Sequence, residues 1–367
     1  MPTPSERLSR MMISGYKSIQ SCDIRFDKIN VLIGSNGAGK TNFISAFVLL
    51  QNVLAKNLQV FAAQSGIPSL FYNGRKETDE ISFELFFGNH SYGFALLPTD
   101  DHRLIFKQEF FGDDNEPGDN VVISSGHTEA LWQASGQSGP GDYVKPILAK
   151  QSWRVYHFHD TGRTSRMKQA HNLANNQALL NDAGNLAAFL YRLKRHFPQS
   201  YADIVRTVQL IAPYFHDFVL VPEEANPEYI VLRWQQAGCE DVFTASQFSD
   251  GTLRFICIAT LLLQPPELQP ATIILDEPEL GLHPYANAVF AEMVKRQLSD
   301  DKQVILSTQS VELLNEFDVE DVIVVDRSEH GSVFQRLDRA SLDAWLENDY
   351  ALGELWKKNI LGGRLSR

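Results

Sequence analysis

Cysteine is scarce in this chain, and a surplus of basic residues is missing. Cys22, Cys239 and Cys257 are scattered along 367 residues without a C-x-x-C pair. This odd set indicates neither a disulfide framework nor a zinc site, and it fits a reducing cytosol. Lysine and arginine total 33 against 45 aspartates and glutamates, so the net charge is −12 and the pI is near 5.3. The composition argues against a general electrostatic grip on DNA or on an anionic membrane, while local basic patches stay open.

A long hydrophobic run is missing as well. The start, "MPTPSERLSRMM", has no apolar stretch of signal-peptide length. The longest candidate for a membrane span, Phe255 to Leu263, has about half of the roughly 20 apolar residues that a bilayer requires. Apolar residues still make up 44% of the chain, which is typical of a globular protein. We therefore expect a soluble, cytoplasmic protein without a membrane partner, built as two domains or one bilobed domain.

The hydrophobic periodicity changes along the chain. Residues 22–34 predict two short strands, followed by an amphipathic helix from Phe43 to Leu54. Between residues 81 and 110 the period is two, which predicts an antiparallel meander. After the strand "WRVYHF", the chain reads as helical to about residue 213. The remaining expectations are loops at 112–120 and 135–142, a strand in "EYIVLRW", a helix from Ser249, strands in "ATIILD", "QVILS" and "DVIVVD", and a helix at 285–298.

The alternation of strand and helix after residue 248 predicts a parallel α/β sheet. We divide the chain into four parts. These are an N-terminal lobe with the antiparallel meander (1–150), a mainly helical insertion (151–245), a C-terminal lobe (246–330) and a tail packed on that lobe (331–367).

"GSNGAGKT", Gly34 to Thr41, fits the phosphate-binding pattern G-x-x-x-x-G-K-[ST] in full. It follows a predicted strand and opens a predicted helix, so backbone N–H groups and the helix N-terminus can surround a phosphate chain. In this P-loop, Lys40 would reach the β- and γ-phosphates, and Thr41 would bind Mg²⁺. The pattern predicts ATP and Mg²⁺ as cofactors. The residues predicted to bind the nucleotide here are Gly34, Ser35, Asn36, Gly37, Ala38, Gly39, Lys40, Thr41 and Asn42.

"IILDEPELGLHP" places two adjacent carboxylates at the end of an apolar strand. With a P-loop upstream, Asp276 is predicted to bind the metal and Glu277 to orient the attacking water. Glu279, the third carboxylate, reads as a surface or capping residue.

"QFSDGTLRF", Gln247 to Phe255, allows two interpretations that are compatible with each other. Ser249 or Asp250 can cap the helix that follows. Ser249, Gly251 and the free N–H groups of the helix start can also form a second anion site. A chain with one P-loop does not need a second site for the γ-phosphate, unless the P-loop and the second site come from different subunits.

The order of these motifs, ending in the strand "VILSTQS", resembles the ABC-type ATPase heads of the SMC and RecF group. "FSDGTLRF", "LDEPELGLHP", "STQS" and the tail "ALGELWKKNILGGR" resemble most closely the stand-alone predicted AAA-family ATPases of bacteria, several of which are encoded in anti-phage defence operons beside an effector. The resemblance implies a bilobed α/β P-loop ATPase with a mixed sheet, an antiparallel β subdomain and a helical subdomain.

The resemblance also implies that two heads enclose two ATP molecules as a homodimer or higher oligomer. Ser249 and Gly251 would then face the P-loop of the other subunit, and Leu280 to Pro284 would form the D-loop at the dimer seam. His283 is a contact there or an ordinary packed or capping histidine. Tyr16 and Lys17 lie where relatives contact the adenine or phosphate region, and a strand-edge pair explains them equally well.

"STQS" occupies the switch position, where ABC transporters usually place histidine and this chain has Gln309. Glutamine can donate and accept a hydrogen bond but cannot take a proton at neutral pH. With Lys40 and Glu277, Gln309 completes the predicted catalytic set, and we expect slow or partner-gated ATP hydrolysis.

A Q-loop glutamine has no clear counterpart, and 156–166 is the candidate region by order. The densest basic area is a candidate contact for DNA, RNA or an acidic partner, although a solvated face explains each residue alone. It consists of Arg154, Arg163, Arg166, Lys168, Arg192, Lys194 and Arg195.

Three functions fit these motifs. The first is an ATP-gated switch that controls a separate effector, a nuclease or toxin, in anti-phage defence. The second is a RecF-like DNA-repair or recombination ATPase that binds DNA directly. The third, a transporter subunit, is disfavoured because the switch histidine is absent and the signature, which here is Ser249 to Thr252, is not Ser-Gly-Gly-Gln. Only 57 residues follow Ser310, with no full nuclease domain, so we expect any effector on another chain.

Overall fold

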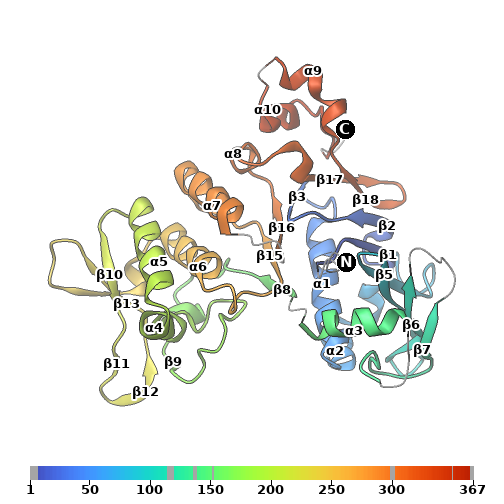
Figure 1. Ribbon diagram of the computed structural model, residues 1–367, viewed down its shortest axis with the longest axis horizontal. Coiled ribbons are helices and arrows are strands. Elements are labelled where there is room, and N and C mark those ends of the chain that lie inside the picture. The colour runs from blue at the N-terminus through green and yellow to red at the C-terminus, as the bar shows by residue number, and fades with distance from the viewer. Residues whose placement is uncertain are drawn as a thin grey trace.

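A mixed sheet of 12 strands forms the centre of the protein, in the order β7-β6-β5-β4-β1-β2-β18-β17-β3-β16-β15-β8. The computed structural model describes residues 7–113, 120–134, 139–150, 153–297, 302–348 and 350–363. Figure 1 shows two lobes, with α4 to α7 on the left, α1 to α3 and the long strands on the right, and α8 to α10 above them. The bilobed α/β architecture predicted from the motifs is therefore confirmed.

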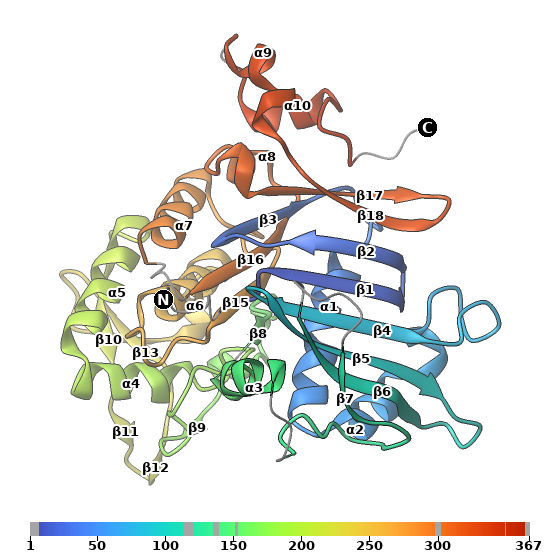
Figure 2. The same cartoon turned by 45° about the vertical axis from the view of Figure 1, so that its right-hand side comes forward.

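The part of the sheet from β7 to β18 is antiparallel, and the period-two pattern at 81–110 predicts the meander within it. Figure 2 shows these strands as one continuous ribbon stack beside α1 and α2. Its strands are β1 (Arg10–Tyr16), β2 (Ile19–Arg25), β4 (Ile81–Phe87), β5 (His90–Pro98), β6 (Leu104–Asp113), β7 (Val121–Ser124) and β18 (Gly331–Arg336).

The remaining part of the sheet is parallel, which confirms the expectation from the strand–helix alternation. Its strands are β3 (Ile29–Ile33), β8 (Trp153–Tyr156), β15 (Thr272–Asp276), β16 (Gln303–Thr308) and β17 (Val322–Ser328). The carboxyl ends of neighbouring parallel strands lie at the same edge of a sheet. The P-loop after β3, the carboxylates after β15 and the switch after β16 therefore meet at one edge.

The parallel strands are apolar throughout because both faces are covered. In β15, Ile273 and Leu275 belong to one buried core and Ile274 belongs to the other. The first core takes side chains from α4 to α8 and α10, and the second takes side chains from α1 and α2. A strand alternates its side chains between faces, so each apolar run contributes to both cores at once.

The helices around these cores include those predicted at 43–54, from Ser249 and at 285–298. They are α1 (Lys40–Leu54), α2 (Leu58–Ser65), α3 (Pro140–Lys150), α4 (Leu186–His196), α5 (Pro198–Ile211), α6 (Asp250–Leu263), α7 (Pro284–Gln297), α8 (Val311–Leu314), α9 (Asp343–Leu346) and α10 (Leu352–Lys357). Single 3₁₀ turns are η1 (Ile67–Leu70), η2 (Arg166–Lys168), η3 (Ala245–Gln247), η4 (Val319–Asp321) and η5 (Arg339–Ser341).

Two predictions about the middle of the chain are wrong. The chain between 157 and 185 is not helical apart from the turn η2, because Asn and Asp side chains hold its backbone. Asn185 shows this clearly, since its amide donates to the carbonyls of Asn175 and Ala178, each at 2.8 Å. "EYIVLRW" is two strands in separate small sheets rather than one. Those sheets are β10-β13-β14 and β11-β12-β9, built from β9 (His171–Asn172), β10 (Phe215–Val219), β11 (Pro222–Glu223), β12 (Asn226–Ile230), β13 (Arg233–Gln236) and β14 (Val242–Thr244).

The two predicted loops lie largely outside the described residues, which omit 114–119 and 135–138. At their described ends, β6 continues to Asp113 and α3 begins at Pro140, so both loops are shorter than predicted. The division of the chain at residues 150, 245 and 330 stays a prediction. None of the helices in the described ranges has the length and apolar composition needed to cross a bilayer.

Candidate nucleotide-binding site

The P-loop joins β3 to α1 at the carboxyl edge of the parallel sheet. Gly39 immediately precedes α1 with φ 124°, in the region that favours glycine. A Cβ atom at this position would lie 2.0 Å from the Ser332 hydroxyl oxygen. That hydroxyl donates to the Ala38 carbonyl at 2.6 Å, so β18 supports the turn from outside the motif. The P-loop conformation therefore requires glycine at position 39.

Lys40, the charged residue of the loop, is buried, with only 5% of its surface exposed. Its Nζ donates to the carbonyl of Gly34 at 2.7 Å and to that of Ser35 at 3.2 Å. Burial lowers the pKa of Lys40, and the carboxylates of Glu277, Asp276 and Glu279 oppose that shift. The ammonium group is thus held over the loop and lies within electrostatic reach of all three carboxylates.

Tyr16 and Lys17 fasten the end of β1 to α1. Tyr16 is fully buried, and its hydroxyl lies 3.1 Å from the Ser45 hydroxyl. Lys17 donates from Nζ to the same Ser45 oxygen at 2.9 Å. Asn42, the residue after the motif, donates to the Ser18 hydroxyl at 2.8 Å. Tyr16 is therefore a packing residue, whereas a ligand contact by the half-buried Lys17 stays a prediction.

The two adjacent carboxylates lie beside the switch strand, as predicted. Asp276 pairs with Ser307 in the parallel ladder, and its Oδ1 accepts a hydrogen bond from the Ser307 hydroxyl. The backbone N–H of Glu277 donates to the Ser307 carbonyl at 3.0 Å, and Glu277 has φ 44°, a left-handed conformation that is strained for this residue. The Gln309 amide donates to Glu277 Oε1. The strained turn thus aims the Glu277 carboxylate at the switch glutamine.

Glu279 is buried, so its interpretation as a surface residue is wrong. Its Oε1 accepts from the Thr308 hydroxyl at 2.6 Å and from the Gln309 backbone N–H at 3.0 Å. Burial raises the pKa of Glu279 above its usual value, and these hydrogen bonds reduce the shift. Glu279 therefore caps the end of β16 and fixes the backbone that carries Gln309.

A cavity of about 180 Å³ brings the P-loop and the second carboxylate together. Its lining residues are Ser35, Asn36, Gly37, Gly39, Lys40, Thr41, Asn42 and Glu277. Small-molecule sites usually measure about 300–1,000 Å³. The cavity is therefore too small to enclose a nucleotide by itself.

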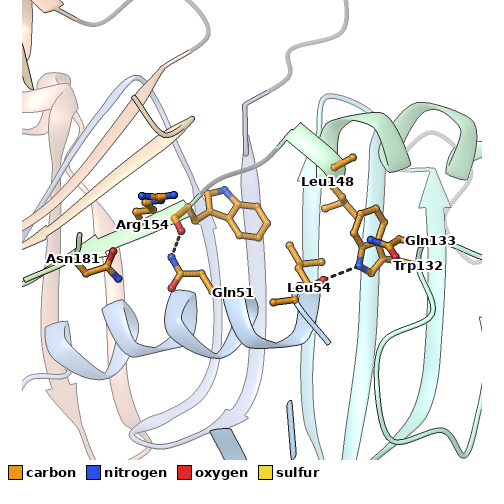
Figure 3. A pocket seen from close by; sticks show the side chains of 10 residues that line it. Gln51, Leu54, Trp132, Gln133, Leu148, Arg154 and Asn181 are labelled. Carbon is orange, nitrogen blue, oxygen red and sulfur yellow. Dashed lines mark hydrogen bonds between the residues drawn. The ribbon is translucent and has the colours of Figure 1, made fainter. Parts of the chain in front are cut away.

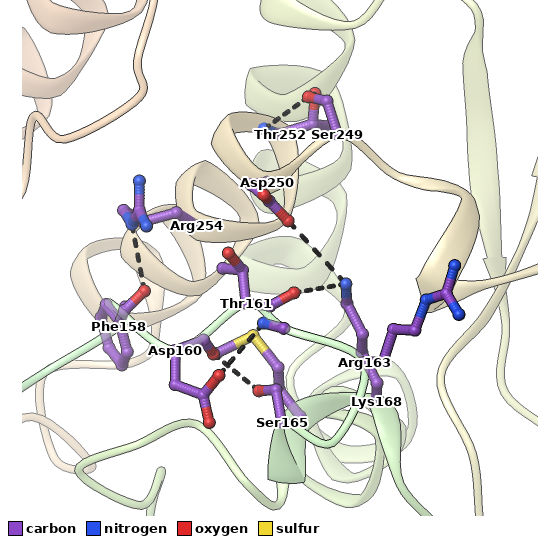
Figure 4. A network of polar contacts seen from close by, with 12 residues as sticks. Phe158, Asp160, Thr161, Arg163, Ser165, Lys168, Ser249, Asp250, Thr252 and Arg254 are labelled. Atoms are coloured by element: carbon purple, nitrogen blue, oxygen red, sulfur yellow. Dashed lines mark hydrogen bonds and ion pairs between the residues drawn. The ribbon is translucent and has the colours of Figure 1, made fainter.

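Ser249 and Gly251 are not among the residues that line this cavity. Ser249 is exposed and caps α6, because its hydroxyl oxygen accepts the Thr252 N–H at 3.1 Å (Figure 4). A Cβ atom on Gly251 would lie 2.2 Å from the Gly281 carbonyl, so the start of α6 packs directly on the segment 280–284. His283 also caps a helix, since its Nδ1 accepts the Tyr285 N–H at 3.2 Å. The capping interpretations of both residues are confirmed.

The segment after β8 contains contacts that sequence reasoning missed. His159 donates from Nε2 to the Asp276 carbonyl at 2.7 Å. Arg254, buried in α6, donates to the carbonyls of Phe158 at 3.0 Å and His159 at 3.2 Å. Lys168 lies 3.9 Å from Asp250 and also donates to the Thr161 carbonyl (Figure 4). The candidate Q-loop region therefore connects α6 to the Asp276 backbone. Its position directly after the strand β8 is the sequence feature that could have indicated these contacts.

Several residues of the basic area form ion pairs or hydrogen bonds with other residues of the chain. Arg166 pairs with Asp182 at 2.8 Å, and Lys194 pairs with Asp217 at 2.9 Å. Arg192 donates to Gln177 at 2.9 Å, and Arg195 donates to the Tyr191 hydroxyl at 2.7 Å. A contact between this area and nucleic acid or an acidic partner stays a prediction.

A larger cavity, of about 530 Å³, lies away from the P-loop. Figure 3 shows it at the far end of α1, between Gln51, Leu54, Trp132 and Arg154. The Trp132 indole N–H donates to the Leu54 carbonyl at 3.3 Å, and Gln51 donates to the Trp153 carbonyl. This cavity holds none of the predicted site residues, so the smaller P-loop cavity is the candidate site.

Comparison with known proteins gives relatives at three levels. The family model described as "AAA domain, putative AbiEii toxin, Type IV TA system" matches residues 29–315. The "DNA replication and repair protein RecF" of Vibrio cholerae is 37% identical over 82 residues, which are 22% of this chain and 23% of that protein. RecF of Aliivibrio salmonicida is 36% identical over 81 residues, 21% of this chain and 22% of that protein. The chain thus matches less than a quarter of the length of these relatives.

Solved SMC head domains share the fold over nearly the whole chain. An SMC head bound to the C-winged helix domain of ScpA superposes with a TM-score of 0.60 at 15% identity, covering 93% of this chain and 99% of that one. The Pyrococcus furiosus SMC head with an extended coiled coil, bound to the C-terminal domain of ScpA, gives 0.59 at 14% identity with the same coverage. At these identities the likeness concerns the fold alone. Since the family match covers more than three quarters of the 367 residues, this chain belongs to the family of AAA domains described as putative AbiEii toxin, Type IV TA system, and its fold is that of the SMC heads.

Proposed function

We propose that this protein binds ATP with Mg²⁺, hydrolyses it slowly, and closes into a head-to-head dimer that controls a separate effector. One observation carries the proposal. The Glu277 carboxylate lines the same cavity as Lys40 and Thr41 and is held there by the Gln309 amide. A phosphate-binding loop, a carboxylate and a hydrogen-bonding amide are the parts that phosphoryl transfer to water requires.

Each residue has a distinct task in this proposal. Lys40 binds the β- and γ-phosphate oxygens, and the N–H groups at the start of α1 bind the rest of the phosphate chain. Glu277 accepts a proton from the attacking water, and Gln309 holds that carboxylate and the water in line. Gln309 does not titrate near neutral pH, so turnover depends on geometry rather than on protonation of the switch.

The residues present fit a magnesium ion. Mg²⁺ usually binds one or two protein oxygens and keeps its other positions for water and substrate phosphates. The exposed Thr41 hydroxyl and the Asp276 carboxylate are two such oxygens, and the described residues contain no cluster of three or more His, Cys, Asp and Glu that could hold a metal alone. When bound, Mg²⁺ neutralises charge that develops on the phosphate oxygens.

The small size of the P-loop cavity supports the proposed dimer. Ser249 is exposed at the N-terminus of α6, where N–H groups and the helix dipole favour an anion. The P-loop cavity, at about 180 Å³, is smaller than the usual site for a small molecule. A second copy that presents Ser249 and Gly251 to this cavity would enlarge the site and add contacts to the γ-phosphate.

The separate effector is supported by the relatives. The family description names a putative toxin of a toxin–antitoxin system, and the similar SMC heads were solved with a bound ScpA domain. An ATP-dependent dimer offers a surface that exists only in one nucleotide state, which a nuclease or toxin subunit can recognise. We place this switch in bacterial anti-phage defence, in line with the resemblance of the motifs.

A second candidate is a RecF-like ATPase that acts on DNA directly, because 82 residues are 37% identical to RecF. The net charge of −12 and the internal pairing of Arg166 and Lys194 disfavour it. Stimulation of ATP hydrolysis by DNA at physiological salt would favour this candidate over the effector switch.

The test is the molecular mass in solution with and without ATP and Mg²⁺. Glu277→Gln should bind ATP without hydrolysing it, and its mass should double only when ATP is present. Lys40→Ala is the control and should stay at the mass of the free chain. A Glu277→Gln mass that ignores ATP while radiolabelled ATP still binds would refute nucleotide-driven dimerisation.

A further inference from the structure

The segment 350–363, which contains α10, contacts both ends of the candidate site; we call it the brace. It follows α9 and lies next to α8 above the sheet (Figure 1). Leu352, Leu355 and Trp356 are buried in the same core as the parallel strands. The proposed ATPase mechanism uses none of these residues. The brace is therefore an ordered part of the ATPase lobe whose role the motifs leave unassigned.

One end of the brace packs on the helix that follows the switch. Ser310 caps α8, directly after Gln309. The backbone N–H of Gly353 donates to the Asn315 side chain at 2.7 Å. A Cβ atom on Gly353 would lie 2.4 Å from a methyl carbon and 2.7 Å from the backbone oxygen of Val311, so the backbone of α10 packs directly against α8. Movement of α8 would consequently be transmitted to α10.

The other end of the brace is bound to the P-loop. The Ser35 backbone N–H donates to the Gly363 carbonyl at 2.6 Å. The Gly363 N–H in turn donates to the Asp326 carboxylate at 3.3 Å. Gly363 is buried and has φ 77°, and a Cβ atom there would lie 3.3 Å from the Gly34 Cα and 3.1 Å from a Val324 methyl. Only a residue without a side chain fits this approach to the loop without displacing a neighbour.

The peptide groups of Ser35 connect this contact to the phosphate-binding lysine. The N–H of Ser35 is held by Gly363, and the carbonyl of Ser35 accepts from Lys40 Nζ at 3.2 Å and from the Ala38 N–H at 3.2 Å. A hydrogen bond to a buried backbone group that is lost without replacement leaves an unsatisfied donor. Loss of the Gly363 contact would therefore shift the residue that positions Lys40.

We propose that the brace is a positioning element of the nucleotide site, in which Gly363 fixes the P-loop through Ser35 and α10 couples that grip to α8 behind the Gln309 switch. This inference rests on the proposed binding of ATP at the P-loop. It predicts that nucleotide affinity depends on a residue more than 300 positions away from the loop in sequence.

Two neighbouring glycines provide a matched test in the full-length chain. Gly362 and Gly363 have nearly the same positive φ, 80° and 77°, so alanine is strained to a similar degree at either position. At Gly362, however, the nearest atoms to an added Cβ are 3.8 and 3.9 Å away, which is ordinary contact. Gly362→Ala is therefore the control for backbone strain, and Gly363→Ala adds the clash beside the P-loop.

A second pair of variants reaches the same contact without adding an atom. Asp326→Ala removes the acceptor of the Gly363 N–H and leaves the P-loop side untouched, whereas Asp326→Asn keeps a carbonyl oxygen in its place. If positioning is the role, Asp326→Asn should behave like the wild type and Asp326→Ala like Gly363→Ala. Thermal melting of all four variants identifies any that fail to fold.

Two readouts separate this inference from the proposed function. In titrations with a fluorescent ATP analogue, Gly363→Ala should weaken binding by roughly five- to tenfold relative to Gly362→Ala, the loss expected for one hydrogen bond. In hydrogen–deuterium exchange without nucleotide, peptides covering residues 33–42 should exchange faster in Gly363→Ala than in Gly362→Ala. Equal exchange and equal affinity in the two alanine variants would overturn the brace. A wild type that binds no nucleotide would refute ATP binding, and the exchange comparison would still decide the brace.

Discussion

The two surfaces that are predicted to enclose ATP differ in how completely the chain builds them. On the P-loop side, Lys40 is 5% exposed and bonded to two carbonyls, and Gly39 is fixed against Ser332. On the signature side, Ser249 and Asp250 are exposed, and within the described part of the chain the Ser249 hydroxyl bonds to Thr252 of its own cap. The first surface is organised before any ligand arrives. The second presents its donors to solvent.

This difference teaches which properties belong to one chain and which require two. A preorganised P-loop can bind nucleotide in a monomer, because its donors and its lysine are already in place. The exposed start of α6 adds nothing to that binding until another molecule brings a phosphate to it. Variants on the two sides should therefore separate nucleotide affinity from assembly.

The largest effect is expected from Lys40→Ala, which breaks the P-loop side. The buried ammonium group supplies a charge-assisted contact to phosphate, so its loss should weaken ATP binding by roughly a hundredfold or more. Titration with a fluorescent ATP analogue measures this change. Lys107→Ala, which removes a lysine paired with Glu80 outside the cavity lining, is the matched control. Comparable losses in both variants would contradict the role given to Lys40.

A second variant, Ser249→Asp, breaks the signature side alone. Aspartate still caps α6, because its carboxylate can accept the Thr252 N–H, but it places a negative charge where a phosphate must approach. The ATP-dependent dimer of a Glu277→Gln background should weaken by roughly thirtyfold or more through this like-charge contact. Sedimentation or light scattering across protein concentrations measures that affinity.

The control for this variant is Ser249→Asn, which retains a cap and adds no charge. Affinity of the monomer for ATP should be unchanged in both variants, since Ser249 does not line the P-loop cavity. A dimer that forms equally well with aspartate at position 249 would remove the signature from the interface.

The switch sharpens the comparison, because Gln309 donates hydrogen bonds to Glu277 and Glu279 on the P-loop side. Gln309→Ala should lower kcat by roughly ten- to a hundredfold, the value of one hydrogen bond to a charged group. Gln309→His should instead introduce an ionisation near the ordinary histidine pKa of about 6.5 into the pH–rate profile. Steady-state kinetics across pH, compared with the wild type, measure both changes.

If the wild type shows an ionisation of that kind and Gln309→Ala retains it, the result would contradict control of ATP hydrolysis by the switch. His159 would then be the next residue to change, since it donates to the Asp276 carbonyl. Burial lowers the pKa of the neighbouring His157, with the Asp276 carboxylate opposing the shift, so His157 should be neutral near pH 7.

The parts of the site that could be predicted from sequence are short and contiguous. The P-loop, the Asp276–Glu277 pair and the switch each follow an apolar run directly, and parallel pairing then places Asp276 opposite Ser307. The spacing within each motif carries the chemistry, so local reading is sufficient. The same logic explains why the antiparallel meander at 81–110 was visible in advance.

The contacts that could not be predicted join distant segments that have no motif. Ser332 supports the P-loop from β18, and Gly363 binds Ser35 from beyond the ATPase motifs. "EYIVLRW" is apolar enough for one strand, yet Ile230 pairs with β9 while Trp234 pairs with β10 and β14. Strand partners and backbone approaches of this kind depend on tertiary packing, which a local pattern does not encode.

The smallest predicted effect concerns Glu279, the buried carboxylate behind the switch. Burial raises its pKa, so between the usual value and the raised value the folded chain holds a proton that the unfolded chain has released. The contribution of Glu279 to the free energy of unfolding therefore falls as pH rises through this window, and it stays low at higher pH. Glu279→Gln removes the titration and can keep the acceptor for Thr308 and Gln309. Relative to the wild type, the variant should gain stability in urea unfolding as the pH rises above the ordinary glutamate pKa of about 4.3. A difference between the two proteins that does not change with pH would mean that Glu279 carries the same charge in the folded and unfolded chain, and that the carboxylate fixes the switch backbone through geometry alone.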